Sequence, residues 1–178
     1  MIRKATLADV DAIERIYNAI LDQEEAGEVR VGWQRGVYPT RQTALDAIEQ
    51  AGDMYVMTAD DDEAAVVAAA RINQEQVPEY ANADWEQDAP AEQVMVLHTL
   101  VVDPEAGRHG YGKRFVAFYE QLAAQSGCPY LRMDTNERNV RARALYKKLG
   151  FAEPDIVDCD FNGIDGIRLV CLEKKLDI

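Results

Sequence analysis

The chain has 178 residues and a formal net charge of −13, with 48% hydrophobic and 29% charged residues. These values fit a globular chain with a sizeable core, and we expect residues 1–178 to form one domain. The acidic excess argues against a nucleic-acid partner, which needs a basic face. No apolar run is long enough to span a bilayer, so we expect no membrane contact and a cytoplasmic location.

The first part of the chain predicts strands and helices from hydrophobic spacing. Alternating residues indicate a strand, and apolar residues at helical spacing indicate a helix. Thr6 and Asp9 form a capping-box pattern ahead of the first helix, and Thr40 is a typical N-cap for the second. In chain order, the expected elements are a strand at 2–5, a helix to about residue 22, a helix at 43–51, and a hairpin of strands at 53–59 and 64–72.

Two segments, 23–39 and 73–93, lack a regular period but contain large aromatic side chains. Aromatic residues in a loop often cover a binding site. We therefore predict that Trp33, Tyr38 and Trp85 bind the substrate. Packing over the core is the alternative interpretation.

Residues 94–127 predict a buried strand at 94–102, a glycine-containing loop and a helix that ends at Gly127. The first N–H groups of a helix have no partner inside it, so a glycine turn at this point can hold an anion. Gly110 and Gly112 stand there, among the basic residues Arg108, His109, Lys113 and Arg114. We predict a phosphate-bearing ligand. The alternative is that the glycines only make a tight connection.

The last part predicts a strand at 130–135, a helix that begins near Asn139, and a hairpin of strands at 151–161 and 167–175 joined by a turn at 162–166. The order of elements describes an α+β fold with a mixed sheet. The crossover from 94–102 to 130–135 should be parallel, with a ligand at the carboxyl ends of these strands. Cys128, Cys159 and Cys171 lack disulfide or metal-ligand spacing, so we expect buried thiols and no metal.

Two stretches resemble motifs of the GNAT superfamily of N-acetyltransferases. LVVDPEAGRHGYGKRFV resembles motif A. NVRARALYKKLGF resembles motif B, N-x-x-A-x-x-L-Y-x-x-x-G-F. The residues that match every fixed position of motif B are Asn139, Ala142, Leu145, Tyr146, Gly150 and Phe151. Motif A departs from the usual pattern because Gly107 stands where Arg or Gln is typical, a change that we expect to tune affinity.

The resemblance implies a three-layer fold with a mostly antiparallel sheet, and transfer of an acetyl group from acetyl-CoA to a primary amine of a small molecule or peptide in a ternary complex. It implies that Tyr146 is the general acid for the CoA thiolate. It also implies that Asn139 contacts the pantetheine arm, although Asn139 is equally an ordinary helix N-cap. The residues implied to bind CoA through their main chain are Leu100, Val101 and Val102 for pantetheine, and Arg108, His109, Gly110, Tyr111, Gly112 and Lys113 for pyrophosphate.

The glutamate that serves as general base in one branch of the family has no counterpart in this sequence. In the histone-acetylating branch of the family the base is a Glu on the central strand, and Val96 occupies that position here. His98 lies on the same strand face, and its ordinary pKa near 6.5 suits a base. The alternatives are that His98 is a hydrogen-bonded core residue, or that carboxylates of segment 73–93 act through water: Asp84, Glu86, Asp88 and Glu92.

Two other functions remain open at this point, a non-catalytic CoA-binding or sensing module and a transferase of a longer acyl group. The acidic residues of the loops at 23–39 and 73–93 favour a cationic acceptor. A homodimer through the C-terminal hairpin would follow the family's habit.

Overall fold

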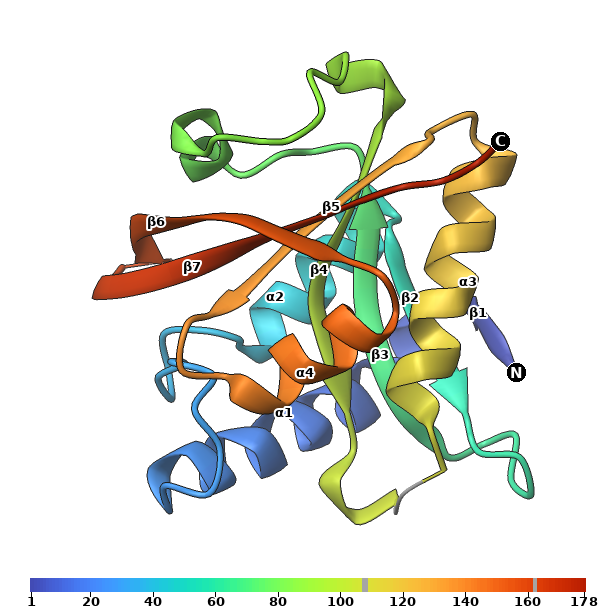
Figure 1. Cartoon of the computed structure of the whole chain (residues 1–178). Coiled ribbons are helices and arrows are strands. Elements are labelled where there is room, and N and C mark those ends of the chain that lie inside the picture. The colour runs from blue at the N-terminus through green and yellow to red at the C-terminus, as the bar shows by residue number, and fades with distance from the viewer. Residues whose placement is uncertain (107–108, 162) are drawn as a thin grey trace.

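A seven-stranded sheet forms the middle layer of the computed structural model, which describes residues 1–106, 109–161 and 163–178 (Figure 1). The strands are β1 (Ile2–Lys4), β2 (Met54–Thr58), β3 (Val66–Asn73), β4 (Val94–Val102), β5 (Tyr130–Asn136), β6 (Ala152–Phe161) and β7 (Ile164–Lys175). The helices are α1 (Val10–Glu25), α2 (Arg41–Asp46), α3 (Tyr111–Gln125) and α4 (Val140–Lys148). The strand order is β1-β2-β3-β4-β5-β7-β6.

The sheet is antiparallel except for one pair of strands. β4 and β5 run parallel from Val94 opposite Tyr130 to Leu97 opposite Met133, and α3 connects them. The other five neighbouring pairs are antiparallel. The prediction of a mixed, mostly antiparallel sheet with a central parallel crossover is therefore confirmed.

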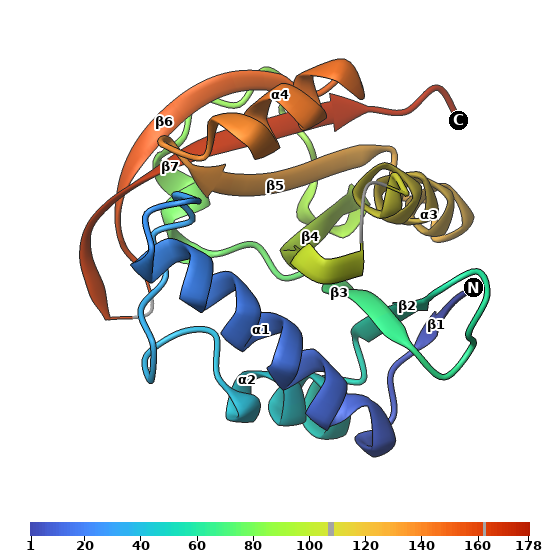
Figure 2. The same cartoon turned by 90° about the horizontal axis from the view of Figure 1, so that it is seen from below.

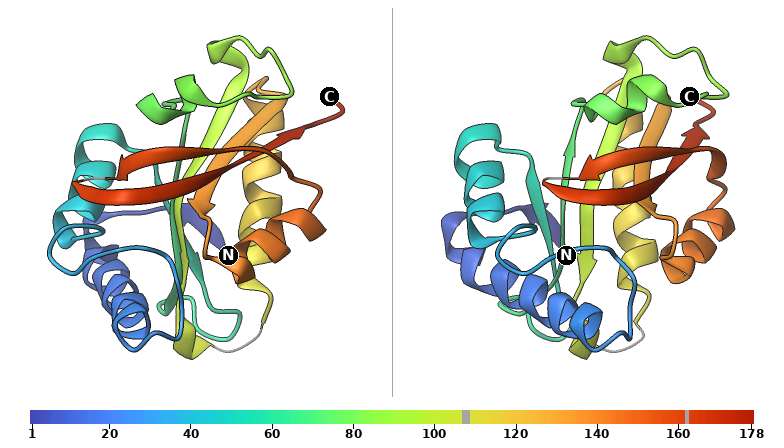
Figure 3. Two further views of the ribbon diagram at one scale, coloured as in Figure 1. Left: turned by 60° about the vertical axis from the view of Figure 1, so that its left-hand side comes forward. Right: turned by 90° about the vertical axis from the view of Figure 1, so that its left-hand side faces the viewer.

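Helices cover both faces of the sheet, which gives the predicted three layers (Figure 3). On one face, Ile13, Ile16 and Tyr17 of α1 pack on β2, β3 and β4. On the other face, Phe115 and Tyr119 of α3 are fully buried in a core that also holds side chains of α4. Figure 2 shows α1 and α2 on the opposite side of the sheet from α4. Each large side chain buried in this way contributes about 1.5–3 kcal/mol.

Most predicted element boundaries agree with the structure, and the differences have local causes. The Thr6–Asp9 capping box is present, and α1 continues to Glu25. The predicted helix at 43–51 begins earlier and changes to a wider π turn at Ala47–Ala51. The predicted turn at 162–166 is too long, because Ile164 is buried and already pairs with Phe161. Asn162 lies outside the described residues. The three cysteines are buried and free, as predicted.

β4 and β5 separate where their hydrogen-bonded ladder ends, and we call this place the fork. The last paired residues are Leu97 and Met133, although both strands continue beyond them (Figure 1). A bulge in β4 lies at the same place, since Thr99 and Leu100 together oppose one residue of β3 and Thr99 has a φ of +53°. Bulges bend a strand and end its pairing. The main-chain groups of β4 that face β5 beyond Leu97 are therefore left without a partner in the sheet.

No helix within the described ranges is both long and apolar enough to cross a membrane.

Candidate active site

The first α-helix after the free end of β4 is α3, which begins at Tyr111. Gly110 is the N-cap residue with a φ of +72°, and no described side chain caps it. The Arg114 N–H donates the first helical hydrogen bond, to the Gly110 carbonyl at 3.0 Å. The N–H groups of Tyr111, Gly112 and Lys113 therefore lie ahead of the helical ladder, where they can hold an anion.

The two glycines at this turn have different roles. A Cβ at Gly110 would meet no heavy atom of a described residue within 4 Å, so the described residues leave the space beside its main chain open. A Cβ at Gly112 would lie 3.4 Å from Leu145 and 3.8 Å from Val102. Gly112 thus lets α3 pack closely on α4 and β4, which is the alternative role in which a glycine only makes a tight connection. Gly110 instead forms the turn that is open on the side of the described residues.

The predicted cluster of cationic side chains is only partly available to a ligand. Arg114 makes two 2.8 Å hydrogen bonds with Asp60 in the β2–β3 turn, so its charge is already paired. The His109 ring lies 5.5 Å from the Tyr111 ring, and Lys113 is exposed. Arg108 lies outside the described residues.

The predicted pantetheine-binding residues Leu100, Val101 and Val102 form the free end of β4. The Val101 side chain is buried under α1, and Leu100 and Val102 pack towards the core beneath α3 and α4. Their side chains thus fix the strand while part of its main chain faces the fork.

Tyr146 of α4 has a buried ring and a reachable hydroxyl group. The residue is 7% exposed, and its ring packs edge-on against Phe151. The hydroxyl makes no hydrogen bond with a described residue. Among the described residues, every fully buried side-chain nitrogen or oxygen has a hydrogen-bond partner. Because the Tyr146 oxygen has none, it is not fully buried and reaches accessible space. Burial, together with the nearby charge of Asp134, raises the pKa of Tyr146, and the phenol stays protonated at neutral pH.

Asn139 takes the capping geometry. Its Oδ1 accepts a hydrogen bond from the Ala142 N–H, and its Nδ2 donates to Thr135, both at 3.2 Å. The helix N-cap interpretation is thereby confirmed. Its contact with a cofactor stays a prediction.

His98 is held by a chain of hydrogen bonds. The Asn73 Nδ2 donates a hydrogen bond to Asp53 at 2.6 Å. The Oδ1 of the same amide accepts a hydrogen bond from His98 Nε2 at 2.9 Å. Burial lowers the pKa of His98 to about 4. This is the geometry of the core-histidine alternative, and the low basicity argues against the predicted role as general base. The four carboxylates named as water-mediated alternatives are exposed on segment 73–93.

Asp134, which sequence reasoning missed, is the first residue of β5 beyond the ladder with β4. Met133 packs in the core beneath α3 and α4, so Asp134 points to the opposite face. The Tyr80 hydroxyl donates to its Oδ2 at 2.8 Å. The second carboxylate oxygen of Asp134 makes no hydrogen bond with a described residue. Since every fully buried side-chain oxygen among these residues has a partner, this oxygen is accessible. Burial raises the pKa of Asp134 to about 6. An acidic residue inside an otherwise buried strand was the signal that could have identified it.

The three predicted substrate-binding aromatics lie in different surroundings. The Tyr38 hydroxyl hydrogen-bonds Thr99 at the bulge, and the Tyr38 ring meets Trp33 edge-on at 5.9 Å. Trp85 packs within segment 73–93, where its indole N–H donates to the Tyr80 carbonyl, and its ring centroid lies 4.1 Å from the Arg132 guanidinium carbon. These contacts explain Trp85 without a ligand, whereas Tyr38 contacts the bulge at the fork and Trp33 packs against Tyr38.

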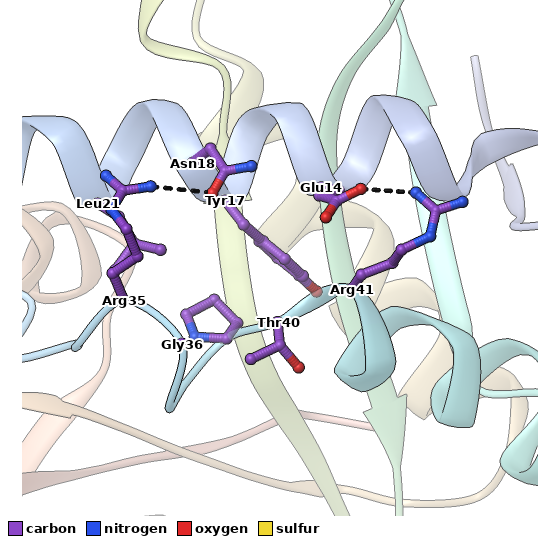
Figure 4. A pocket seen from close by; sticks show the side chains of 9 residues that line it. Glu14, Tyr17, Asn18, Leu21, Arg35, Gly36, Thr40 and Arg41 are labelled. Atoms are coloured by element: carbon purple, nitrogen blue, oxygen red, sulfur yellow. Dashed lines mark hydrogen bonds and ion pairs between the residues drawn. The ribbon is translucent and has the colours of Figure 1, made fainter.

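Two cavities flank this region. The smaller, of about 150 Å³, lies between α1 and segment 35–41, and its arginines Arg35 and Arg41 are bonded to Asn18 and Glu14 (Figure 4). The larger, of about 400 Å³, lies at the carboxyl end of β5 and is lined by Trp33 and Asn136 among others. Within the described ranges, no three His, Cys, Asp or Glu side chains converge as a metal site requires.

Comparisons with known proteins place the chain among acetyltransferases. Two curated relatives match part of the chain. An aminoglycoside N(6')-acetyltransferase type 1 from Serratia marcescens is 31% identical over 74 residues, 42% of this chain and 51% of the relative. An uncharacterized N-acetyltransferase, YhfO, from Bacillus subtilis is 33% identical over 60 residues, 34% of this chain and 40% of the relative. The matches thus span about half or less of these relatives.

The fold as a whole is shared with solved structures. An acetyltransferase of the GNAT family from Streptococcus agalactiae superimposes with a TM-score of 0.79 at 22% identity, over 100% of this chain and 96% of that one. The ribosomal-protein-S18-alanine N-acetyltransferase from Escherichia coli gives a TM-score of 0.67 at 16% identity, over 100% of this chain and 94% of that one. The sequence profile of the acetyltransferase (GNAT) family matches residues 13–151, and the chain belongs to this family.

Proposed function

We propose that this acetyltransferase transfers an acetyl group from acetyl-CoA to a primary amine of a small molecule or peptide, directly and within a ternary complex. The observation that carries the proposal is the fork. Free main chain of β4 leads there to the open N-terminus of α3, with the Tyr146 hydroxyl and the Asp134 carboxylate nearby. The curated relatives, whose names describe N-acetyltransferases, support an amine as acceptor.

The chain offers two sets of main-chain groups for the donor. The free groups of Leu100 to Val102 suit the amides of a pantetheine arm, and the N–H groups at the start of α3 suit a pyrophosphate. Acetyl-CoA would supply the acetyl group as an activated thioester.

Asp134 and Tyr146 are suited to opposite proton transfers. An alkylamine of pKa about 10.4 is almost wholly protonated at pH 7, a cost of roughly 4.6 kcal/mol, so a base must take its proton. With a pKa of about 6, Asp134 is ionised at pH 7 and is a stronger base than His98. Tyr146 keeps its proton until a thiolate, whose conjugate acid has a pKa of about 8.5, needs it.

Saturating acetyl-CoA is expected to stabilise the protein, because a ligand that binds only the native state does so by mass action. At one hundred times the Kd the gain is about 2.7 kcal/mol, which for a chain of this size raises Tm by roughly 5–10 °C. Differential scanning fluorimetry measures the shift, and thiol release with a panel of amines measures turnover. The absence of any shift at millimolar acetyl-CoA would reject the proposal. A shift without turnover would instead indicate the non-catalytic binding module.

Gly110→Ala is expected to weaken CoA binding beyond its effect on the fold. A φ of +72° in an Ala residue costs about 1 kcal/mol, and the new methyl group would occupy the open side of the turn. Gly127→Ala is a matched control, since Gly127 has a φ of +71° and equally open surroundings near the C-terminal end of α3. Urea denaturation should give similar losses for both variants, and calorimetric titration with CoA should give a higher Kd for Gly110→Ala alone. Equal Kd values would exclude this turn as the phosphate site.

A further inference from the structure

We infer that the 400 Å³ cavity binds an anionic group of the acceptor, so that the acceptor is a small primary amine that also carries a carboxylate or a similar anion. This inference rests on the proposed function and specifies its substrate class. It departs from the expectation of a cationic acceptor. Two arginines that line the cavity, Arg30 and Arg138, carry the argument.

The cavity wall also carries the carboxylates of Glu24, Glu137 and Asp165, but among the described residues none of them pairs with Arg30 or Arg138. Arg168 is paired with Glu137 at 3.0 Å and with Asp158 at 3.4 Å. Glu24 accepts the main-chain N–H groups of Val31 and Gly32 through its Oε2. In the part of the chain that the structure describes, neither Arg30 nor Arg138 forms an ion pair with a carboxylate, although the chain has a net charge of −13.

The smaller cavity shows the opposite arrangement. Arg35 bonds to Asp22 and Glu25, and Arg41 bonds to Asp11 and Glu14. Most described arginines of this acidic protein are paired in the same way with carboxylates of the chain. Arg141 also lacks an ion pair among the described residues, but it does not line the cavity. Two cations that line one cavity without such a partner are suited to an anion from outside, which a planar guanidinium binds through paired hydrogen bonds.

The wall of the cavity is closely packed against β5. A Cβ at Gly32, whose φ is +77°, would lie 2.4 Å from Nδ2 of Asn136, so only glycine lets this segment approach the strand. Asn136 is itself buried. The position of Arg30 beside the cavity therefore follows from a fixed contact between segment 26–40 and the end of β5.

The cavity lies within reach of the reacting groups. Asn136 follows Asp134 on the same face of β5, about 7 Å further along the strand. From the other side, Trp33 lines the cavity and meets Tyr38, which bonds to Thr99 at the bulge. An acceptor whose amine lies at Asp134 and whose anion lies in the cavity therefore needs several bonds between the two groups, as in an ω-amino acid.

The test compares 4-aminobutanoate and 6-aminohexanoate with their uncharged amides, using thiol release from acetyl-CoA. In these chains the amine is far from the carboxyl end, so its basicity is nearly the same in acid and amide. We expect kcat/KM at least tenfold higher for the acids. Arg30→Gln and Arg138→Gln should each raise KM for the acids about tenfold and leave KM for the amides and for acetyl-CoA unchanged. Both arginines are exposed, so the variants should fold.

Arg35→Gln is the matched control, since it removes an exposed charge from the same segment but outside the cavity, and should leave every KM unchanged. Equal kcat/KM for acids and amides would overturn the inference while the proposed function stands. A rise in KM for acetyl-CoA in Arg138→Gln, without a rise for the acids, would assign Arg138 to the nucleotide and also overturn it. An aminoalkylphosphonate that is preferred over both acids would support the anionic site with a phosphonate as its ligand.

A binding experiment separates failure of the inference from failure of the proposed function. With CoA present, 6-aminohexanoate should raise Tm by more than its amide does, whether or not acetyl transfer occurs. Equal shifts for the acid and the amide would overturn the anionic site. A larger shift for the acid, with no thiol release from any amine, would reject the enzymatic function and keep the site.

Discussion

Asp134→Asn is expected to lower kcat by about two orders of magnitude or more and, at the same time, to stabilise the protein at neutral pH. Positioned proton transfer contributes typically 10²–10⁴-fold to a rate, and an amide cannot accept the proton. The shape of the side chain is kept, and the Tyr80 hydroxyl can still donate to the amide oxygen. KM for acetyl-CoA should therefore change little.

The gain in stability follows from the raised pKa of Asp134. In the folded protein this pKa is about 6, against an ordinary value of 3.8. Between these values the folded state holds a proton that the unfolded state has lost, so stability falls as the pH rises through this window. Above pH 6 the buried charge costs roughly 3 kcal/mol, which asparagine avoids. Below pH 4 both forms are neutral and the variant should gain nothing.

Urea denaturation at pH 7 and at pH 4, together with kcat from thiol release, tests both parts. Wild-type activity should rise with pH through about 6 as the carboxylate ionises. Asp53→Asn is a useful comparison, because Asp53 is a buried aspartate with two hydrogen bonds to Arg71 and should lose stability when changed. If Asp134→Asn kept its kcat, or lost stability as Asp53→Asn does, Asp134 would be a structural residue rather than the base.

The parts of the fold that depend on local pattern could be predicted from the sequence. The apolar spacing of α1 and α3, the run Val94–Val102 and the caps at Thr6 and Asn139 each reflect interactions within a few residues. The role of Tyr146 as general acid came from the resemblance to motif B and stays a prediction. The boundaries failed where tertiary contacts decided them, as at Ile164, which is buried in the sheet although it follows a turn.

The site depends on contacts between distant segments, and the sequence could not supply them. The position of Arg114 in the sequence predicts a phosphate ligand, but in the structure its guanidinium is bonded to Asp60, which is distant in the chain. The role proposed for Asp134 depends on where the ladder between β4 and β5 stops, which coincides with the bulge at Thr99. The cavity that holds Arg30 and Arg138 exists because segment 26–40 folds back on β5 through Gly32.

Tyr146→Phe is expected to lower kcat about a hundredfold while the stability and KM for acetyl-CoA stay close to those of the wild type. The hydroxyl bonds to no described residue, and the ring that fills the core is retained, so the fold loses little. The missing proton donor leaves the departing thiolate unprotonated, which favours the reverse reaction. Because the pKa of Tyr146 is raised above its ordinary value of 10, this group should cause no alkaline loss of wild-type activity below pH 10.

Tyr119→Phe provides the opposite result from the same chemical change. The Tyr119 hydroxyl is buried and donates to the carbonyls of Met95 and Arg132, at 2.6 and 3.1 Å. Its removal should cost about 1 kcal/mol of unfolding free energy and leave kcat unchanged, because the residue is fully buried and its hydroxyl bonds only main-chain groups of the sheet. Single-turnover rates and urea denaturation of both variants measure the two effects separately. An unchanged kcat in Tyr146→Phe would mean that water, rather than Tyr146, protonates the thiolate. A loss confined to KM would assign Tyr146 to binding.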